Sequence, residues 1–336
     1  MPIVLDAMGS DDHPIPEIAA AIEFAKNTGE KIFFVGNKDI IFKHCSESDF
    51  AGLPIEIVHA EHVLEMGDHP VEATRAKPNN SMAVGLKLVK AGSADAFLTA
   101  GSTGAANFNS LRVLGRIKGV ARAALTTLFP TKTGHTIVLD IGANVDCRPE
   151  YLQQFAIMGA IYAEKMRGIK NPKIGLLNMG TEPDKGNALV KETYPLLKSG
   201  KLNFIGNVEP YDVLDGKADV VVTDGYAGNM MLKSSEATAK LMSGILKSGL
   251  KSSVPGMIAG LLGKPVFNEL KSKLDPNAIG AAPLLGVDGL SFVGHGGSNS
   301  TALVNGMKLA KAAADLNLIS LIRDAIQTQL NEEGEN

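Results

Sequence analysis

Thr136-Ile137-Val138-Leu139-Asp140-Ile141 is a short run rich in β-branched and apolar residues. It passes directly into the turn Gly142-Ala143-Asn144-Val145-Asp146, and the helical pattern Pro149–Arg167 follows. The run is apolar almost throughout rather than alternating, which is typical of a strand buried on both faces of a parallel sheet. Because the same order of strand, small-residue turn and helix recurs along the chain, the sequence predicts an α/β fold with a mostly parallel sheet.

Further strand patterns are spread from one end of the chain to the other, at residues 3–8, 31–35, 55–60, 94–100, 173–178, 202–208, 218–224 and 290–293. Helical patterns such as residues 184–198 lie between them and are long enough to serve as crossovers. No linker rich in proline, glycine and serine divides the chain, and no repeat with a fixed period is visible. We therefore expect residues 1–336 to form one two-lobed unit with interwoven lobes and a frayed tail at residues 331–336.

Composition and charge argue against several classes of protein. Apolar residues make up 45% and charged residues 21% of the 336 residues, which is the composition of a large globular protein. The formal net charge of −3 gives no basic excess, so we expect no nucleic-acid partner. The chain has two cysteines, no signal-peptide pattern at its start and no run near the ~18 apolar residues of a membrane span. We therefore expect a cytoplasmic protein.

One segment departs from the alternation of strands and helices. From Ala227 to about Leu274 there is helical periodicity and no strand pattern. A first apolar stripe ends at Leu250, and after Ser252-Ser253 a second series follows at helical spacing, with members Val254, Met257, Ile258, Leu261 and Leu262. The spacing predicts a helical hairpin at residues 237–274 with an apolar tip.

Five turns rich in small and polar residues follow predicted strands, and they begin at Ala100, Asp140, Asn178, Asp224 and His295. In an open parallel sheet such turns all lie at the carboxyl edge, where ligands bind. Free backbone N–H groups and the positive helix end make each turn suitable for an anion. Each is also compatible with a simple helix cap, since Ser102, Asp184 and Ser298 are good N-cap residues. No turn has the GxxxxGK[ST] or GxGxxG pattern, so a dinucleotide is only weakly indicated.

Candidates for a nucleophile or a metal site are poor. There is no GxSxG motif, and Cys147, although it lies next to Arg148, more commonly represents a buried inert thiol. His59 and His62 lack carboxylates or thiolates at matched spacing, so we expect no metal site. His59 closes a predicted strand and fits either a core histidine or a site group. Lys185 lies near a predicted helix start, where a lysine is unfavourable for the helix dipole, which indicates either a functional charge or an exposed surface lysine.

A basic cluster surrounds the end of the helix that residues 101–104 open, and its members are Arg112, Arg116, Lys118 and Arg122. These side chains either complement the negative end of the helix dipole or form a docking patch for an acidic partner.

Ordered blocks at these turns carry a close resemblance that covers almost the whole chain. They are DAMG (residues 6–9), AGSTGA (100–105), LGRIKG (114–119), LDIGANVD (139–146), GLLNMGTE (175–182), KGN (185–187), FIGNVE (204–209), TDGYAGN (223–229), LK (232–233) and HG (295–296). In these blocks the chain resembles the bacterial phosphate acyltransferases of phospholipid synthesis (acyl-acyl carrier protein:phosphate acyltransferases, the PlsX family). It departs from the usual pattern at Ser10, where the family has glycine, at Ser102, where it has asparagine, and at Gly297, where serine is common.

The resemblance implies an isocitrate dehydrogenase-like or phosphotransacetylase-like architecture, with two lobes, a cleft between them and a homodimer. It implies transfer of a long acyl chain from acyl carrier protein to inorganic phosphate, without a cofactor. The acyl phosphate product would feed a membrane glycerol-3-phosphate acyltransferase. It also implies that the helical hairpin touches the inner face of the cell membrane, so that the protein is a peripheral one.

An attacking phosphate needs no serine or cysteine nucleophile, only an anion seat, oxyanion stabilisation and positioning. We assign Lys185 to the phosphate or the developing oxyanion, and Asn229 and Asn144 to orientation. Asp140 and Asp224 would fix turns or steer protons, and His59 would carry a proton to the leaving thiol. The candidate phosphate and substrate residues are Gly101, Ser102, Thr103, Gly104, Asp140, Asn144, Asn178, Gly180, Thr181, Asp224, His295 and Ser298. The candidate membrane contacts are Leu250, Val254, Met257, Ile258, Leu261 and Leu262, and the basic cluster is the candidate carrier-protein contact.

Three rival functions are open to test. The first is a nicotinamide-dependent dehydrogenase on a related fold, although the sequence shows no clear acidic cluster for its metal. The second is a coenzyme A-dependent transferase of short acyl groups, similar to phosphotransacetylase. The third is a non-catalytic membrane scaffold for lipid enzymes.

Overall fold

The structure, a computed structural model, describes residues 1–267 and 276–334. Within these residues, eleven strands form one sheet in the order β3-β2-β1-β4-β11-β10-β5-β6-β9-β7-β8. The strands are β1 (Ile3–Asp6), β2 (Ile32–Gly36), β3 (Ile55–His59), β4 (Ala96–Thr99), β5 (Ala124–Thr131), β6 (Gly134–Leu139), β7 (Ile174–Leu177), β8 (Phe204–Val208), β9 (Val220–Val222), β10 (Ala282–Leu285) and β11 (Leu290–Val293). A large mostly parallel sheet in an α/β fold is therefore confirmed.

Helices connect and cover these strands. They are α1 (Ile15–Thr28), α2 (Lys38–Ile41), α3 (Pro70–Ala76), α4 (Ser81–Lys90), α5 (Thr103–Val113), α6 (Pro149–Arg167), α7 (Ala188–Ser199), α8 (Pro210–Asp215), α9 (Gly225–Lys251), α10 (Val254–Leu262), α12 (Pro276–Ile279), α13 (Ser300–Asp315) and α14 (Leu318–Gly334), with a short 3-10 turn η1 (Glu47–Phe50). Helix α6 has the predicted bounds, because Pro149 is suited to the first helical turn and Gly168 ends the helix with φ 68°.

Strands β5 and β10 were not predicted, and they divide the sheet into two lobes. Strands β1, β2, β3, β4 and β11 run parallel in the first lobe, and β6, β7, β8 and β9 run parallel in the second. The three pairings between the lobes, β11–β10, β10–β5 and β5–β6, are all antiparallel. The two parallel groups therefore point in opposite directions, and the expectation that all five turns share one carboxyl edge was wrong.

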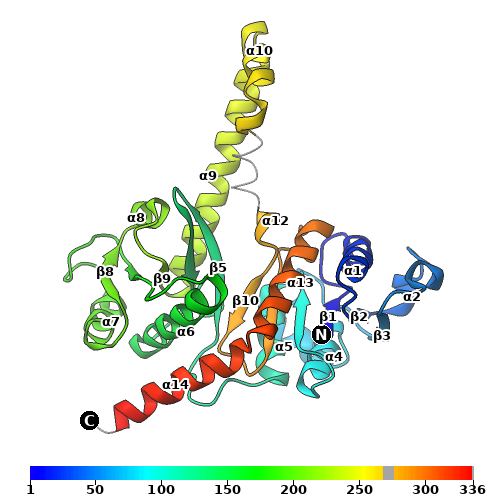
Figure 1. The fold of residues 1–336 in the computed structure, drawn as a ribbon, viewed down its shortest axis with the longest axis horizontal. Helices are drawn as coiled ribbons and strands as arrows, with labels where there is room; N and C mark the ends of the chain where they lie inside the picture. The colour runs from blue at the N-terminus through cyan, green and yellow to red at the C-terminus, as the bar shows by residue number, and fades with distance from the viewer. Residues whose placement is uncertain (268–275, 335–336) are drawn as a thin grey trace.

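Apolar side chains cover both faces of the sheet. On one face, Phe24 of α1, Phe155 of α6 and Met307 of α13 belong to one fully buried cluster. On the other face, Met82 of α4 and Ala106 of α5 belong to a second cluster. Burying each large side chain contributes about 1.5–3 kcal/mol, so the sheet with its two helical layers forms the stable body of the molecule. Strand β11 and helix α13 return to the first lobe after the chain has built the second (Figure 1).

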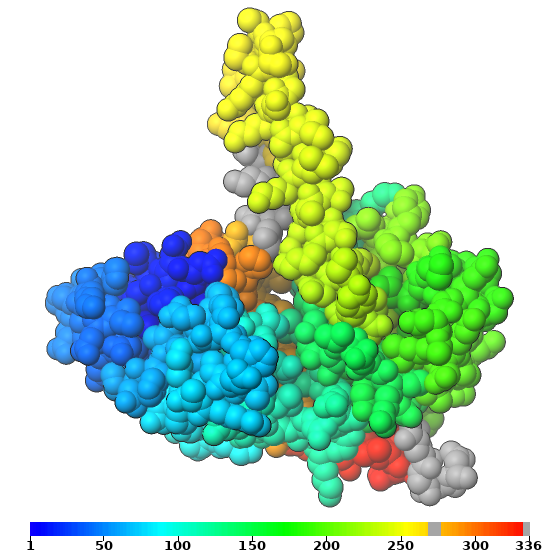
Figure 2. Space-filling model, turned by 180° about the vertical axis from the view of Figure 1, so that it is seen from behind, coloured from blue at the N-terminus to red at the C-terminus, as the bar shows by residue number. Residues whose placement is uncertain are grey.

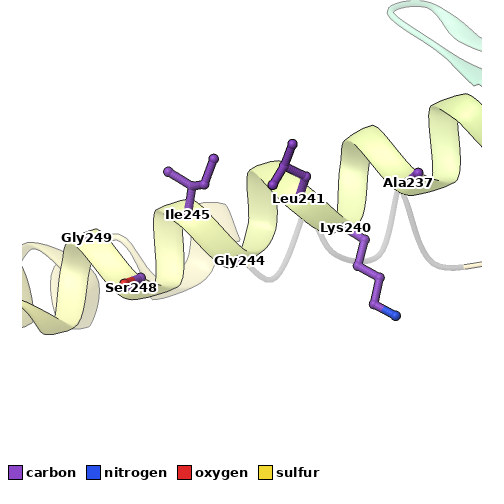
Figure 3. Close-up of a pocket in the computed structure, with 7 residues that line it drawn as sticks. All are labelled: Ala237, Lys240, Leu241, Gly244, Ile245, Ser248 and Gly249. Atoms are coloured by element: carbon purple, nitrogen blue, oxygen red, sulfur yellow. The ribbon is translucent and has the colours of Figure 1, made fainter.

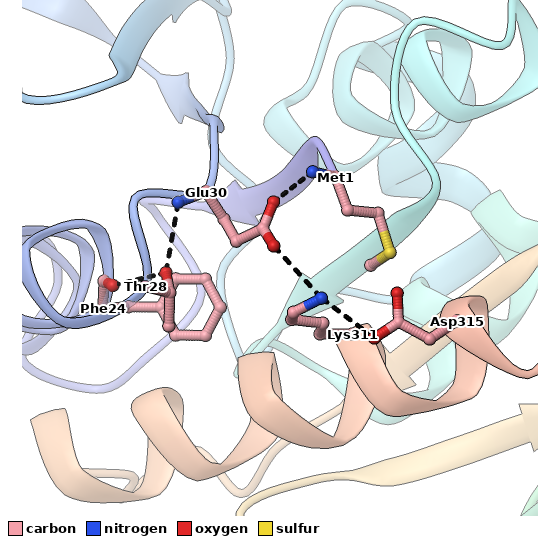
Figure 4. Close-up of polar contacts among 6 residues, drawn as sticks. All are labelled: Met1, Phe24, Thr28, Glu30, Lys311 and Asp315. Carbon is pink, nitrogen blue, oxygen red and sulfur yellow. Dashed lines mark hydrogen bonds and ion pairs between the residues drawn. The ribbon is translucent and has the colours of Figure 1, made fainter.

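A polar network fixes this returning segment to the start of the chain (Figure 4). The N-terminal amino group of Met1 pairs with Glu30, and Lys311 of α13 pairs with Glu30 at 3.1 Å and with Asp315 at 2.9 Å. The backbone N–H of Glu30 donates to the Thr28 hydroxyl at 3.2 Å. The network thus joins the beginning of β1, the end of α1 and α13.

The predicted hairpin projects from the body as a stalk (Figures 1 and 2). Its first arm is the outer part of α9, a continuous helix of 27 residues that begins at Gly225, where its first turn is packed in the body. Helix α10 folds back on the end of α9, where Gly260 faces Leu250. Residues 268–275 of the predicted hairpin lie outside the described residues. In the part of the chain that is described, no helix is both long and apolar enough to cross a bilayer.

The described part of the predicted tail is helical. Helix α14 extends to Gly334, which is well inside the segment 331–336 that we expected to fray. Residues 335–336 lie outside the described part of the chain.

Candidate functional site

The turns after β4 and β11 lie together in the first lobe, because these strands are neighbours. The Thr99 hydroxyl donates to the buried Asp6 carboxylate at 2.7 Å and accepts the N–H of Gly101 at 2.9 Å. The N–H of Gly101 is therefore already used. Ser102 occupies the N-cap position of α5, but its side chain makes no capping hydrogen bond. The N–H groups of Thr103 and Gly104 have no acceptor within the helix, so this helix start can bind an anion.

A third turn, after β1, packs directly against this one. A Cβ atom at Gly9 would lie 2.7 Å from the nitrogen of Ala100 and 2.8 Å from that of Gly101, so only glycine fits there. The N–H of Asp11 donates to the carbonyl of Gly296 at 2.8 Å. The DAMG block thus supports the shape of the neighbouring turns.

The turn after β11 exposes one ring nitrogen of His295. The N–H of Gly297 donates to Nδ1 of His295 at 3.1 Å, so a neutral ring carries its proton on Nε2, which can donate to a ligand. Ser298 is buried and does not cap α13, contrary to our expectation. The N-cap is Asn299, whose side chain accepts the N–H of Ala302 at 3.0 Å.

The second lobe has its own group of turns, because β6, β9 and β7 are neighbours. Asp140 is fully buried, and it accepts the N–H of Leu125 at 3.0 Å and both the N–H and side-chain amide of Asn144, at 2.7 and 2.8 Å. Burial raises the pKa of Asp140, and these hydrogen bonds counteract the rise. Since its oxygens are used inside the protein, Asp140 fixes the turn and does not offer a free carboxylate to substrate.

Helix α9 starts beside this turn. Asp224 is its N-cap and accepts the N–H of Ala227 at 2.7 Å. The N–H of Gly225 donates to the carbonyl of Asn144 at 2.8 Å, which fastens α9 to the Asp140 turn. Asn229 lies close to Gly142 and is exposed, and its side chain forms no hydrogen bond within the described residues. Asn229 is therefore available to a ligand, whereas Asp224 is used as a cap.

Lys185 lies in an exposed turn, not in a helix as predicted. Helix α7 begins at Ala188, and its N-cap is Asn187 rather than Asp184. The side-chain amide of Asn178 donates to the carbonyl of Lys185 at 3.1 Å, and its oxygen accepts the N–H of Met179 at 2.8 Å. Asn178 is buried and holds the turn, so it is not free to bind phosphate. Thr181, like Lys185, is exposed, and Gly180 is partly exposed.

Asn107, which the sequence did not single out, links helix α5 of the first lobe to the Asp140 turn of the second. From α5 its amide donates to the carbonyl of Ala143 at 3.4 Å, so the helix that begins at Ser102 reaches the Asp140 turn. Ala143 and Ala227 pack against the same apolar cluster as α5. Although the strands of the two lobes point in opposite directions, α5 and the Asp140 turn thus contact each other on one face of the sheet.

His59 does not belong to this arrangement. It ends the edge strand β3, and eight strands lie between β3 and β7, after which Lys185 follows. His59 thus lies near one edge of the sheet, outside the turns around Asp140 and α5. His59 is exposed, and its Nδ1 accepts the N–H of Lys38 at 3.4 Å. We therefore remove it from the candidate catalytic residues.

The basic cluster is exposed at the far end of α5 and in the loop that follows. The exposed residues are Arg112, Arg116, Lys118 and Arg122. Arg122 lies 5.7 Å from the ring of Tyr151, and Arg116 bonds the carbonyl of Ala121. In the described residues no three histidine, cysteine or acidic side chains gather as a metal site would require.

A shallow groove runs along the stalk, away from these turns (Figure 3). Its lining residues are Ala237, Lys240, Leu241, Gly244, Ile245, Ser248 and Gly249. Because it contains none of the polar groups that meet around Asp140 and α5, we place the candidate site at those turns and not in the groove.

Comparison with known proteins identifies the family. Residues 1–321 match a family described as "Fatty acid synthesis protein". The phosphate acyltransferase of Dictyoglomus turgidum is 45% identical over 328 residues, which are 97% of this chain and 98% of that protein. The phosphate acyltransferase of Acidobacterium capsulatum is 46% identical over 309 residues, which are 92% of each.

Solved structures of two phosphotransacetylases share the fold. The EutD phosphotransacetylase of Staphylococcus aureus has a TM-score of 0.58 at 17% identity and covers 94% of each chain. A phosphotransacetylase of Streptococcus pyogenes has a TM-score of 0.56 at 17% identity and covers 97% of this chain and 94% of that one. The predicted architecture and the family resemblance are both confirmed. The chain belongs to the phosphate acyltransferase family, whose members are acyltransferase enzymes.

Proposed function

We propose that the protein transfers a long-chain fatty acyl group from acyl carrier protein to inorganic phosphate. One observation supports this reaction most strongly: the cysteine beside the Asp140 turn is unsuited to attack. Burial raises the pKa of Cys147 to about 12, and the nearby carboxyls of Asp140 and Asp224 add to the rise. Since the thiolate is the nucleophilic form, Cys147 is inert at neutral pH. An inert thiol at this turn supports the assignment of phosphate itself as the nucleophile.

In the proposed reaction a phosphate oxygen attacks the thioester carbonyl carbon. The C–S bond breaks, the carrier thiolate leaves and takes up a proton, and acyl phosphate is released. The N-terminal N–H groups of α5 and the Ser102 hydroxyl hold the phosphate, while Lys185 neutralises the phosphate or the developing oxyanion. Asn229 orients the reacting groups. Asn144 holds the turn instead, because its side-chain amide donates to the carbonyl of Ala123 and to Asp140. The acyl phosphate is suited to an enzyme that acylates glycerol 3-phosphate in the membrane.

The test is detection of acyl phosphate from acyl carrier protein thioester and phosphate, with wild type, Lys185→Ala and Lys191→Ala. Lys191 is a matched control, because it is an exposed lysine on the neighbouring helix α7. We expect Lys185→Ala to lower kcat/KM for phosphate by roughly 10²-fold, the usual effect of removing one oxyanion contact. Full turnover by a folded Lys185→Ala variant would eliminate its assigned role.

The same assay separates the rival functions. Turnover with a short-chain coenzyme A thioester but not with the carrier protein would favour a phosphotransacetylase-like enzyme. A membrane scaffold without catalytic activity would show no phosphate-dependent thioester cleavage with either donor.

We also propose that the basic cluster receives the acyl carrier protein. Its four cationic side chains are exposed at the far end of α5, whose other end is the anion-binding start, so a docked acidic partner would lie close to the site. Arg116→Glu together with Lys118→Glu is expected to raise KM for the carrier-linked donor and to leave KM for phosphate unchanged. Unchanged KM for the donor would reject this surface.

A further proposal concerns the tip of the stalk as a peripheral membrane contact. Met257, Leu261 and Leu262 are 53, 73 and 77% exposed, an unusual exposure for large apolar side chains. We expect Met257→Asp with Leu261→Asp to abolish flotation with anionic liposomes. Ile15→Asp is the control, since Ile15 is 57% exposed on the body. Undiminished flotation of the tip variant would reject the proposal. A homodimer that buries the stalk is compatible with exposed tips.

A further inference from the structure

The exposed turn that carries Lys185 is held from beneath by two buried asparagines. Asn178, at the end of β7, bonds the carbonyl of Lys185. The second is Asn207 on β8, whose side-chain amide donates to the carbonyl of Glu182 at 2.8 Å. Asn207 is 4% exposed and pairs with Leu176 on the adjacent strand β7, so it sits under the turn and not beside it.

The hydrogen bonds from Asn178 and Asn207 hold the two ends of one tight turn. The N–H of Lys185 donates to the carbonyl of Glu182 at 3.2 Å, which closes residues 182–185 as a β-turn. The carbonyls of its first and last residues are bonded to Asn207 and Asn178 respectively. Because these amides extend from neighbouring strands of the sheet, the backbone of Lys185 is fixed to the rigid body although its side chain is exposed.

Stability alone does not explain an asparagine at position 207. Its Oδ1 atom is buried and has no hydrogen-bond partner within the described residues. An unsatisfied buried acceptor is destabilising, and an apolar side chain of similar volume would avoid that cost. The amide N–H, by contrast, has a specific use in holding the turn.

We propose that Asn207 is a positioning residue for Lys185, and that its bond to the Glu182 carbonyl fixes the turn from which the Lys185 ammonium group acts on the phosphate or the developing oxyanion. This proposal rests on the proposed role of Lys185. Loss of the bond leaves the turn attached at one end only, through Asn178. A displacement of the order of 1 Å is enough to lower a rate by roughly 10²-fold, so we expect a measurable loss of phosphate use.

The first test compares Asn207→Ala and the similarly branched Asn207→Leu with a matched control, Asn203→Ala. Asn203 lies just before the same strand, and its amide donates to the carbonyl of Asn171 at 3.0 Å, so the control removes the same kind of bond elsewhere. We expect both Asn207 variants to lower kcat/KM for phosphate by roughly tenfold or more, with KM for the acyl donor unchanged. The control is expected to match wild type. Equal behaviour of the Asn207 and Asn203 variants would overturn the proposal.

A second readout reports on the turn directly. Trypsin cleaves after lysine, so the rate of cleavage between Lys185 and Gly186 in the folded protein measures how freely this turn opens. Loss of the Asn207 bond is expected to raise that rate several-fold without raising cleavage at other sites. An unchanged rate, or a general rise at all sites, would contradict a local positioning role. Asn207→Leu keeps the branched shape of the side chain and serves this measurement should Asn207→Ala not fold.

A double-mutant comparison separates this proposal from the role of Lys185. In the Lys185→Ala background, Asn207→Ala is expected to cause no further loss, because it acts through the missing side chain. Multiplicative losses would show that Asn207 acts by another route. Full activity of Lys185→Ala alone would reject the role of the lysine itself. An impaired Lys185→Ala together with a fully active Asn207→Ala would reject only the role of Asn207.

Discussion

Glu17 offers a quantitative test of the packing beneath the candidate site. It lies in the first turn of α1 and is fully buried. One carboxylate oxygen accepts the N–H of Ser10 at 2.9 Å, and the other has no partner within the described residues. Burial raises the pKa of Glu17 from its usual 4.5 to about 7, against the opposing effect of hydrogen bonds from Ser10, and the nearby carboxyl of Asp6 adds to the rise.

The sign and size of the effect follow from linkage. Below pH 4.5 Glu17 is protonated in both the folded and the unfolded chain, so its ionisation does not lower the free energy of unfolding. Between pH 4.5 and 7 only the unfolded chain releases it, so the free energy of unfolding falls as pH rises. The raised pKa corresponds to a decrease of about 3 kcal/mol in the free energy of unfolding, and this decrease is complete above pH 7. Glu17→Gln keeps an acceptor for Ser10 and carries no charge, so we expect it to be more stable than wild type by up to about 3 kcal/mol at pH 8.

Urea unfolding of wild type and Glu17→Gln at several pH values between 4.5 and 8.5 measures this difference. The two proteins are expected to be nearly equal at pH 4.5 and to diverge steadily up to pH 7. Glu23→Gln is the control, since Glu23 is an exposed glutamate on the same helix. A Glu17→Gln variant that is no more stable at pH 8, or whose pH dependence parallels that of wild type, would refute the account of a buried, weakly acidic carboxyl.

Two further outcomes are expected. A Cβ at Gly228 would overlap the carbonyl oxygen of Asp140, so Gly228→Ala should destabilise the protein by about 1–3 kcal/mol and lower acyl transfer. A Cβ at Gly244 on the same helix would lie in open space, so Gly244→Ala should raise stability by roughly 0.5–1 kcal/mol. Thermal unfolding measures both variants, and the opposite ranking would be inconsistent with this packing. Cys147 should react slowly with iodoacetamide at pH 8, because its thiol pKa is about 12, and Cys147→Ser should retain activity; rapid alkylation or an inactive variant would contradict an inert thiol.

The fold was largely predictable because long apolar runs and helix-ending signals are local properties. The pattern Pro149–Arg167 has a proline at its start and Gly168 at its end, so its bounds were correct. The direction of the second lobe was not predictable in the same way. It depends on β5 and β10, which connect the two parallel groups through antiparallel pairings and lack the buried-strand pattern used for the other strands. Missing them led to the wrong expectation of a single carboxyl edge.

The site was predictable by residue type but not by the direction in which side chains point. The turns contain the expected polar residues, yet Asp140 and Asn178 direct their hydrogen-bonding groups inward, and Ser102 does not cap its helix. Asn107 resembles an ordinary polar position in a helix, and Asn207, although it lies in the block FIGNVE, resembles one in a strand. Only tertiary contacts reveal them, because a single sequence does not show which partner lies across a strand or between lobes.

The central claim is that free phosphate attacks the thioester and that no side chain carries the acyl group. Mass spectrometry of protein and product during turnover, with acyl carrier protein thioester and fully ¹⁸O-labelled phosphate, tests it directly. The expected result is acyl phosphate that retains every labelled oxygen, together with a protein mass that never includes an acyl group. An acylated protein that forms and decays at the rate of turnover, or thioester cleavage that proceeds equally well without phosphate, would contradict the claim.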